Sequence, residues 1–376
     1  MTSRARVIAA LEHRQPDRVP VDLWSKGGGL TNGAYRRLRQ HLGIEGEAEA
    51  YRPGQTAAFY DERILERLQI DFRHVFLRPP AGWTPQRKGE NETVNEWGVT
   101  LRRAGDTACP VDPPLAGADL DDLDKYPWPR ADLPGRTDGL KERVERLFAQ
   151  GEHAIAYRPV TPIDYGIFET AWTLRGMEDL LCDMVVDKRF AHKLMRKVLE
   201  TQIAFYDLGL GIAGPYVQVV QIGDDYGTQN APILSPALFR EMIKPYDAEL
   251  IAFIKSKAPR AKVFLHTCGA VRDLIEDLIE AGVDILNPLQ PAAAGMDSAG
   301  LKRDFGARLS FQGAISVQGA LQGTAAEVRA EVERRVDALG GGGGYILAPA
   351  NNISEDVPPE NVVLMYEHAR AYSSRC

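Results

Sequence analysis

The stretch KVFLHTCGAVRDLIEDLIEAGVDILNPLQ, residues 262–290, decides the fold. It opens with an apolar run at 262–266, continues into a helical pattern, and closes with a second apolar run at 283–287. A strand, a helix and a second strand in this order form the unit from which parallel sheets are built. We therefore predict two parallel strands joined by a helix.

The same alternation extends through the chain from about residue 153 onward. Between the apolar runs lie helical patterns: Phe190, Leu194 and Val198 recur every four residues, and Thr324 with Glu327 has the spacing of a capping box. So many repeats favour an α/β fold of the (β/α)8 TIM-barrel type over an open doubly wound sheet, which the pattern also allows. The further apolar runs are 153–157, 216–222, 308–312 and 345–348.

Residues 1–130 differ from the rest because they are rich in proline and turns and follow no single period. Short helices are expected at 3–13, 34–42 and 61–68, and a strand-like run at 75–77. We predict one barrel domain over residues 1–376, in which 1–130 form an N-terminal helical and loop elaboration and 131–376 form the regular βα units.

Composition and charge exclude several classes of protein. The chain has 376 residues, of which 44% are hydrophobic, and a net charge of −7 without a block of basic residues; nucleic acid is therefore not an expected partner. No run of about 18 apolar residues and no signal-peptide core appear, so we expect a cytoplasmic protein that does not enter a membrane. The four widely spaced cysteines, Cys109, Cys182, Cys268 and Cys376, do not form a disulfide framework.

Polar side chains follow five of the apolar runs. Carboxyl ends of parallel strands meet at one rim, where α/β proteins bind their ligands, so we expect these side chains to line one site. Alternatively, the amides satisfy loop backbone groups and the acids cap helices. The residues are Gln221, Asp224, Asp225, His266, Cys268, Asn287, Gln290, Gln312, Asn351 and Asn352.

His266 and Cys268 are the most informative pair on this rim. Residues i and i+2 at a strand end point to the same side, so an imidazole and a thiolate can bind one Zn²⁺. A catalytic zinc takes three protein ligands, and the third stays open among Asp224, Asp225 and Glu169. A buried thiol beside a hydrogen-bonded histidine, or a Cys/His nucleophile pair, are the alternatives.

Two acids are catalytic candidates beside this pair. Adjacent residues on a strand face opposite ways, so one of Asp224 and Asp225 projects inward and the other caps the loop. Asp71 precedes an apolar run together with Arg73. It is either half of a solvated loop pair with Arg73 or an acid near the barrel mouth that orients or protonates a substrate.

Four stretches resemble the uroporphyrinogen decarboxylase superfamily: RVIAALEHRQPDRVPVD (6–22), VVQIGDDYGTQNAPILSPALFREMIKPY (219–246), residues 262–290, and GGGGYILAPANNISEDVPPENVVLMYE (341–367). The resemblance implies a (β/α)8 barrel with a deep cleft at the strand carboxyl ends. The decarboxylases of this superfamily carry an arginine-rich N-terminal segment, which VDLWSKGGGLTNGAYRRLRQ (21–40) lacks. Asp71 falls roughly where they place their essential aspartate, so a metal-independent decarboxylase is the alternative function.

Membership in the methyltransferase branch of the superfamily is the preferred interpretation. Its zinc-binding members use a His-x-Cys, matched here by His266 and Cys268, and a later cysteine, where this chain has Ala350 and Asn351. The resemblance implies an enzyme that moves a methyl group from a small O- or N-methyl compound to or from a corrinoid carried by a partner protein. Zinc at His266 and Cys268 would polarise the methylated atom, or both residues contact substrate in a zinc-free pocket.

The catalytic candidates are Asp71, Asp224 and His266, and the metal ligands are His266 and Cys268. Substrate would be bound by Gln221, Asn287, Gln290, Gln312 and Asn351. A binding protein without turnover is the non-enzymatic alternative, and the oligomeric state stays open, a homodimer included.

Overall fold

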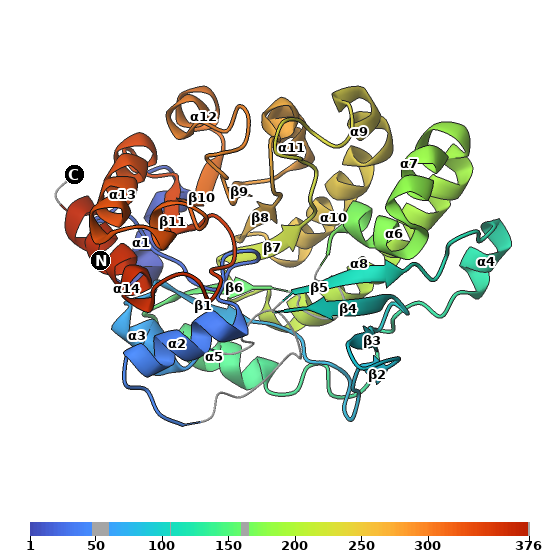
Figure 1. Ribbon diagram of the computed structural model, residues 1–376, viewed down its shortest axis with the longest axis horizontal. Coiled ribbons are helices and arrows are strands. Elements are labelled where there is room, and N and C mark those ends of the chain that lie inside the picture. The colour runs from blue at the N-terminus through green and yellow to red at the C-terminus, as the bar shows by residue number, and fades with distance from the viewer. Residues whose placement is uncertain (47–59, 106, 159–164, 375–376) are drawn as a thin grey trace.

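A curled parallel sheet forms the centre of the molecule in the computed structural model, which describes residues 1–46, 60–105, 107–158 and 165–374 (Figure 1). Seven strands are hydrogen-bonded in the order β1-β6-β7-β8-β9-β10-β11. Each strand lies beside the strand of this sheet that precedes it in the sequence, as in a (β/α)8 barrel. The predicted fold class is confirmed. The strands are β1 (Phe72–Val75), β6 (Ala154–Tyr157), β7 (Val219–Gly223), β8 (Lys262–His266), β9 (Ile285–Asn287), β10 (Ser310–Ile315) and β11 (Tyr345–Pro349).

A short N-terminal segment occupies the position between the first and the last strand. Val21 forms a parallel bridge with Leu347 of β11, and the Asp22 amide donates to the Leu347 carbonyl over 3.0 Å. On its other side, the Val21 carbonyl accepts from the Asp71 amide, just before β1, over 3.0 Å. Residues 20–22 therefore stand in the place of an eighth strand and link β11 to β1.

The first 130 residues contribute more to the barrel than an elaboration around it, since they supply residues 20–22 and β1. The expected strand at 75–77 lies three residues earlier, at 72–75. A separate antiparallel sheet, seen in teal on the right of Figure 1, has the strand order β2-β3-β4-β5. Its strands are β2 (Gln86–Arg87), β3 (Glu92–Val94), β4 (Thr100–Ala104) and β5 (Thr107–Asp112).

Helices surround the parallel sheet (Figure 1). The predicted capping box of Thr324 with Glu327 begins α13, and the Ser235 hydroxyl accepts from the Leu238 amide at the start of α9. The helices are α1 (Ser3–Leu11), α2 (Asn32–His41), α3 (Glu62–Arg67), α4 (Leu120–Lys125), α5 (Leu140–Gln150), α6 (Ile167–Arg175), α7 (Met177–Val186), α8 (Lys188–Ala213), α9 (Pro236–Met242), α10 (Lys244–Lys257), α11 (Ile275–Ala281), α12 (Ser298–Phe305), α13 (Ala325–Leu339) and α14 (Pro359–Ser373).

Within the described ranges, none of the helices has the length and apolar character needed to cross a membrane. Cys109, Cys182 and Cys268 are free thiols, in agreement with the sequence-based expectation. Cys376 lies outside the described residues.

Candidate active site

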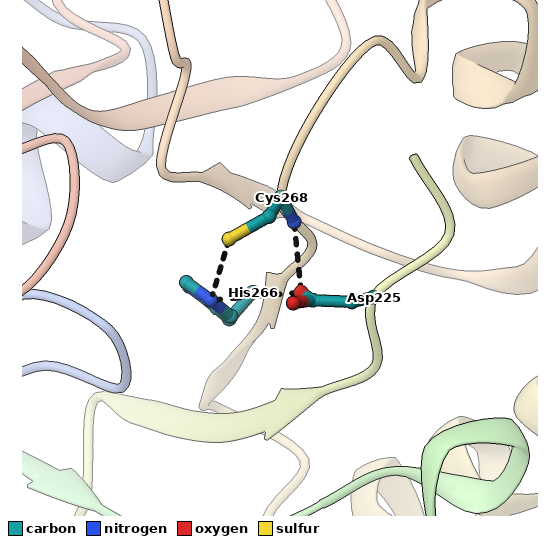
Figure 2. Close-up of side chains that lie close together, drawn as sticks. All are labelled: Asp225, His266 and Cys268. Carbon is teal, nitrogen blue, oxygen red and sulfur yellow. Dashed lines mark hydrogen bonds and ion pairs between the residues drawn. The ribbon is translucent and has the colours of Figure 1, made fainter. Parts of the chain in front are cut away.

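Three side chains with metal-ligating groups meet at the carboxyl ends of β7 and β8 (Figure 2). His266 is the last residue of β8, Cys268 follows two residues later, and Asp225 follows β7. The His266 Nε2 lies 3.4 Å from the Cys268 Sγ and 3.7 Å from the Asp225 Oδ1. The three ligand atoms all lie within 4.8 Å of one another. We call Asp225, His266 and Cys268 the His-Cys-Asp triad.

Strand register brings the triad together. His266 is paired with Gly223 of β7 on one side and with Asn287 of β9 on the other, so the loops after these strands leave the sheet at one level. The Cys268 amide donates to the Asp225 Oδ1 over 2.9 Å. This bond ties the loop after β8 to the loop after β7, and it sets the Asp225 carboxylate beside the thiol.

The triad fits zinc by ligand type and by spacing. Imidazole nitrogen, thiolate sulfur and carboxylate oxygen are the three ligand atoms that protein-bound zinc uses. Tetrahedral zinc with ordinary bond lengths places a nitrogen and a sulfur ligand about 3.5 Å apart, and the His266 Nε2 and Cys268 Sγ are separated by 3.4 Å. Of the three open candidates for a third ligand, the structure therefore brings Asp225 to the pair.

Burial determines the protonation states of His266 and Cys268. It lowers the pKa of His266, which favours the neutral ring that a metal requires. It raises the pKa of the Cys268 thiol, and the carboxylates of Asp225 and Glu169 raise it further. In the metal-free protein Cys268 is therefore a thiol, and a bound divalent cation would supply the positive charge that stabilises its thiolate.

Asp224 points away from the triad and holds the start of α6. Its Oδ2 accepts from the Phe168 amide and its Oδ1 from the Glu169 amide, each over 2.7 Å. Burial raises the pKa of this carboxyl well above its usual range. One acid of the pair faces the site and the other caps a structural element, but the residue at the site is Asp225, not the expected Asp224. Asp224 caps α6 because the loop after β7 places its carboxylate at the helix amino terminus.

Asp71 lies at the opposite end of the barrel, so it is not near the barrel mouth as expected. It precedes β1, and strand carboxyl ends form the mouth. The Arg6 and Arg18 guanidiniums bind its fully buried carboxylate at 2.7 and 2.8 Å, and the Val21 amide donates to it over 2.8 Å. Arg73, its expected partner, instead pairs with Glu62.

Four of the amide side chains expected to bind substrate contact the protein itself. The Gln221 Oε1 accepts from the Lys26 amide over 3.0 Å, and the Gln290 Oε1 accepts from the Gly269 amide over 2.8 Å. The Gln312 Nε2 donates to Asp22 over 2.8 Å. The Asn351 Nδ2 lies 3.7 Å from the Cys268 Sγ, so of these four it is the one in contact with the triad.

A comparison with known families decides what the chain is related to. The model of the family described as uroporphyrinogen decarboxylase (URO-D) matches residues 96–372. The chain belongs to the uroporphyrinogen decarboxylase family. The resemblance seen in the sequence is confirmed.

Some known proteins similar to this uroporphyrinogen decarboxylase family member are named decarboxylases, and one solved structure is named a methyltransferase. The uroporphyrinogen decarboxylase of Legionella pneumophila is 27% identical over 212 residues, 54% of this chain and 56% of that protein. The one of Thermus thermophilus is 29% identical over 186 residues, 47% of each chain. The chain thus spans about half the length of the curated relatives it matches. A solved methyltransferase from Methanosarcina mazei has a TM-score of 0.69 at 18% identity over 99% of both chains, which agrees with the barrel fold.

An N-terminal turn covers His266 in this family member, a position that was not predicted from the sequence. The glycine run at 27–29 reads as an ordinary turn, yet Gly27 has a φ of +63° and packs against the His266 ring. The Lys26 side chain lies across Gly223, and its ammonium stands 5.3 Å from the centre of the Tyr165 ring. The only sequence signal is that three consecutive glycines permit such a close approach.

A second polar pair lies inside the barrel and was also missed. The Asp22 Oδ1 is 3.1 Å from the His74 Nε2, and both side chains are almost fully buried. Because Gln312 donates to the other oxygen of Asp22, these contacts connect residues 20–22 to β1 and to β10. An aspartate within the apolar run VPVDLW and a histidine within β1 were the available signals.

We expect Gly27→Ala to disrupt the triad without unfolding the protein. An added Cβ would lie 2.0 Å from the His266 Cε1, so the ring or the turn must shift, which changes where Nε2 lies relative to Cys268 and Asp225. Zinc affinity, measured by competition with a chromophoric chelator, should fall about 10-fold or more. Gly43→Ala is the matched control, since Gly43 has a φ of +64° but open space around it. Equal losses in both variants would show that backbone strain, not the contact with His266, is responsible.

A cavity beside the triad contains a buried acid whose charge depends on pH. Lys26, Gln221, Asp224, Tyr226 and Asp247 are among its lining residues. Burial raises the pKa of Asp247 to about 7, and the Tyr226 hydroxyl donates to it over 2.6 Å.

This pKa predicts how stability changes with pH. Between about pH 4 and about pH 7 folded Asp247 keeps a proton that the unfolded chain releases, so the free energy of unfolding should fall as the pH rises. Asp247→Asn stays neutral and should show a smaller fall than the wild type; Asp224, whose pKa is also raised, contributes to the fall in both proteins. Urea unfolding at about pH 5 and about pH 8 checks this. A fall as large in the variant as in the wild type would contradict it.

Proposed function

We propose that this member of the uroporphyrinogen decarboxylase family is a zinc-assisted methyltransferase. It moves a methyl group from a small O- or N-methyl compound to or from a corrinoid carried by a partner protein. The His-Cys-Asp triad carries the proposal, because three such ligands with a fourth position open are the donor set of catalytic zinc sites. The name of the Methanosarcina mazei neighbour, a methyltransferase, agrees with it.

Each residue of the site has a separate task in this proposal. Zinc, when bound, supplies a Lewis acid that polarises the methylated oxygen or nitrogen. His266 offers its Nε2 from the buried side, whereas the Asp225 side chain is 38% exposed, so the open side of the site lies toward Asp225. Asn351, beside the Cys268 sulfur, is in position to orient a substrate that enters there. Asp224 keeps α6 in place through the Phe168 and Glu169 amides.

The test uses free cob(I)alamin in place of the corrinoid partner. Zinc-loaded protein is incubated with it and a panel of methoxylated aromatic compounds and methylamines, and methylcobalamin is followed by its absorbance. We expect formation with at least one donor, and loss of that activity after zinc is removed with a chelator. Absence of zinc binding together with absence of methyl transfer from every donor would overturn the proposal.

A metal-independent decarboxylase is the second candidate, since the relatives at 27–29% identity are named uroporphyrinogen decarboxylase. Its expected acid, Asp71, is buried under two arginines at the far end of the barrel, which speaks against it. Incubation with uroporphyrinogen distinguishes the two candidates: release of CO₂ by metal-free protein supports the decarboxylase, and we expect none.

A further inference from the structure

We propose that Asn287 is a positioning residue that holds the proton of His266 on Nδ1 and so leaves Nε2 free toward Cys268 and Asp225. Its consequence for zinc rests on the proposed function, but the tautomer does not. From the sequence, we expected Asn287 to bind substrate. The structure instead places it at the end of β9, fully buried, with its Oδ1 2.6 Å from the His266 Nδ1.

The orientation of the Asn287 amide follows from its other contact. The Asn287 Nδ2 lies 3.1 Å from the backbone carbonyl of Gln312. A carbonyl oxygen only accepts hydrogen bonds, so the amide nitrogen must face Gln312 and the amide oxygen must face His266. An amide oxygen likewise only accepts, and the His266 Nδ1 must therefore carry a proton.

The remaining ring nitrogen is then the one available to a metal. In a neutral imidazole with the proton on Nδ1, Nε2 has a free lone pair. The Nε2 of His266 is the atom that lies 3.4 Å from the Cys268 Sγ and 3.7 Å from the Asp225 Oδ1. The Gln312 carbonyl of β10 thus determines, through the Asn287 amide, that the proton lies on the His266 Nδ1. The unprotonated Nε2 then faces Cys268 and Asp225.

The ring is also held in place from its other side. A Cβ on Gly27 would lie 2.0 Å from the His266 Cε1, so the N-terminal turn is in close contact with the ring edge. Rotation of the ring would break the bond to Asn287 and press on this turn. The support is rigid, because Asn287 and Gln312 lie on neighbouring strands, and the Gln312 side chain is itself anchored on Asp22.

The tautomer can be read directly in metal-free protein. The chain has seven histidines, so ¹⁵N-histidine labelling gives few signals, and His266→Gln identifies those of His266. We expect long-range ¹H–¹⁵N spectra of the wild type to show the Nδ1–H form. Asn287→Leu, which removes the acceptor, should show a mixture or the Nε2–H form, and zinc affinity should fall about 10- to 100-fold.

Two further variants separate positioning from general loss of structure. Asn287→Asp keeps an acceptor toward His266 and should retain the Nδ1–H form, and it replaces Asn287→Leu as the test if that variant does not fold. Asn361→Leu is the matched control, because Asn361 is a buried amide that donates to the carbonyls of Leu321 and Gly323, away from the triad. It should leave the tautomer and the zinc affinity unchanged.

The outcomes are distinguishable from those of the proposed function. The Nε2–H form in the wild type, its appearance in Asn287→Asp, or an unchanged tautomer in folded Asn287→Leu would each overturn the positioning role. A wild-type protein that shows the Nδ1–H form but binds no zinc would refute the zinc-assisted function alone.

Discussion

The double variant His266→Ala, Cys268→Ala is expected to bind no zinc, whereas the wild type binds about one zinc per chain. Two of the three ligands are lost, and a lone carboxylate that is 38% exposed does not retain the ion. Methyl transfer to cob(I)alamin should disappear with the metal. Metal analysis of both proteins after purification and desalting measures this directly.

A control for this experiment uses the same residue types outside the site. His41 and Cys182 are both exposed, so His41→Ala, Cys182→Ala should keep the full zinc content. Loss of zinc in the control would mean that the ion binds at the surface. A wild-type protein without zinc, even after incubation with the metal, would contradict the zinc part of the proposal.

The barrel strands could be predicted because apolar residues fill them. The run at 262–266 agrees with β8 at both ends, since the strand is covered on both faces and its apolar residues need no distant partner. β1 was placed three residues too late because its two central residues, Arg73 and His74, are polar. They are buried there because Glu62 and Asp22 pair with them, and no local pattern reveals partners so far away in the sequence.

Only those features of the site that follow from the position of residues at a strand end could be predicted. The i, i+2 spacing of His266 and Cys268 placed both groups on one side of β8. The choice between Asp224 and Asp225 depended on where α6 begins, because the α6 amides bind the Asp224 carboxylate. The roles of Gly27 and Asn287 depended on contacts across the barrel. Residue spacing within one strand thus predicted which side chains share a site. Contacts between different elements could be identified only once the fold was known.

Asp71→Ala is expected to lower the free energy of unfolding by about 3–5 kcal/mol, the usual result of removing one partner of a buried ion pair. The change leaves the Arg6 and Arg18 guanidiniums, of which Arg6 is buried, without their shared carboxylate. It also removes the acceptor of the Val21 amide, which helps hold residues 20–22 between β11 and β1. Urea unfolding of the variant and the wild type measures the difference.

A second variant, Asp71→Asn, separates a structural from a catalytic role of Asp71. Asp132→Ala, which removes a solvent-exposed partner of Arg130, is the control and should hardly change stability. If Asp71 is structural, the folded fraction of Asp71→Asn at low temperature should retain methyl transfer per folded molecule, because the triad lies at the other end of the barrel. A variant as stable as the wild type that specifically loses uroporphyrinogen decarboxylation would instead show that Asp71 is catalytic, and the decarboxylase would replace the methyltransferase as the function.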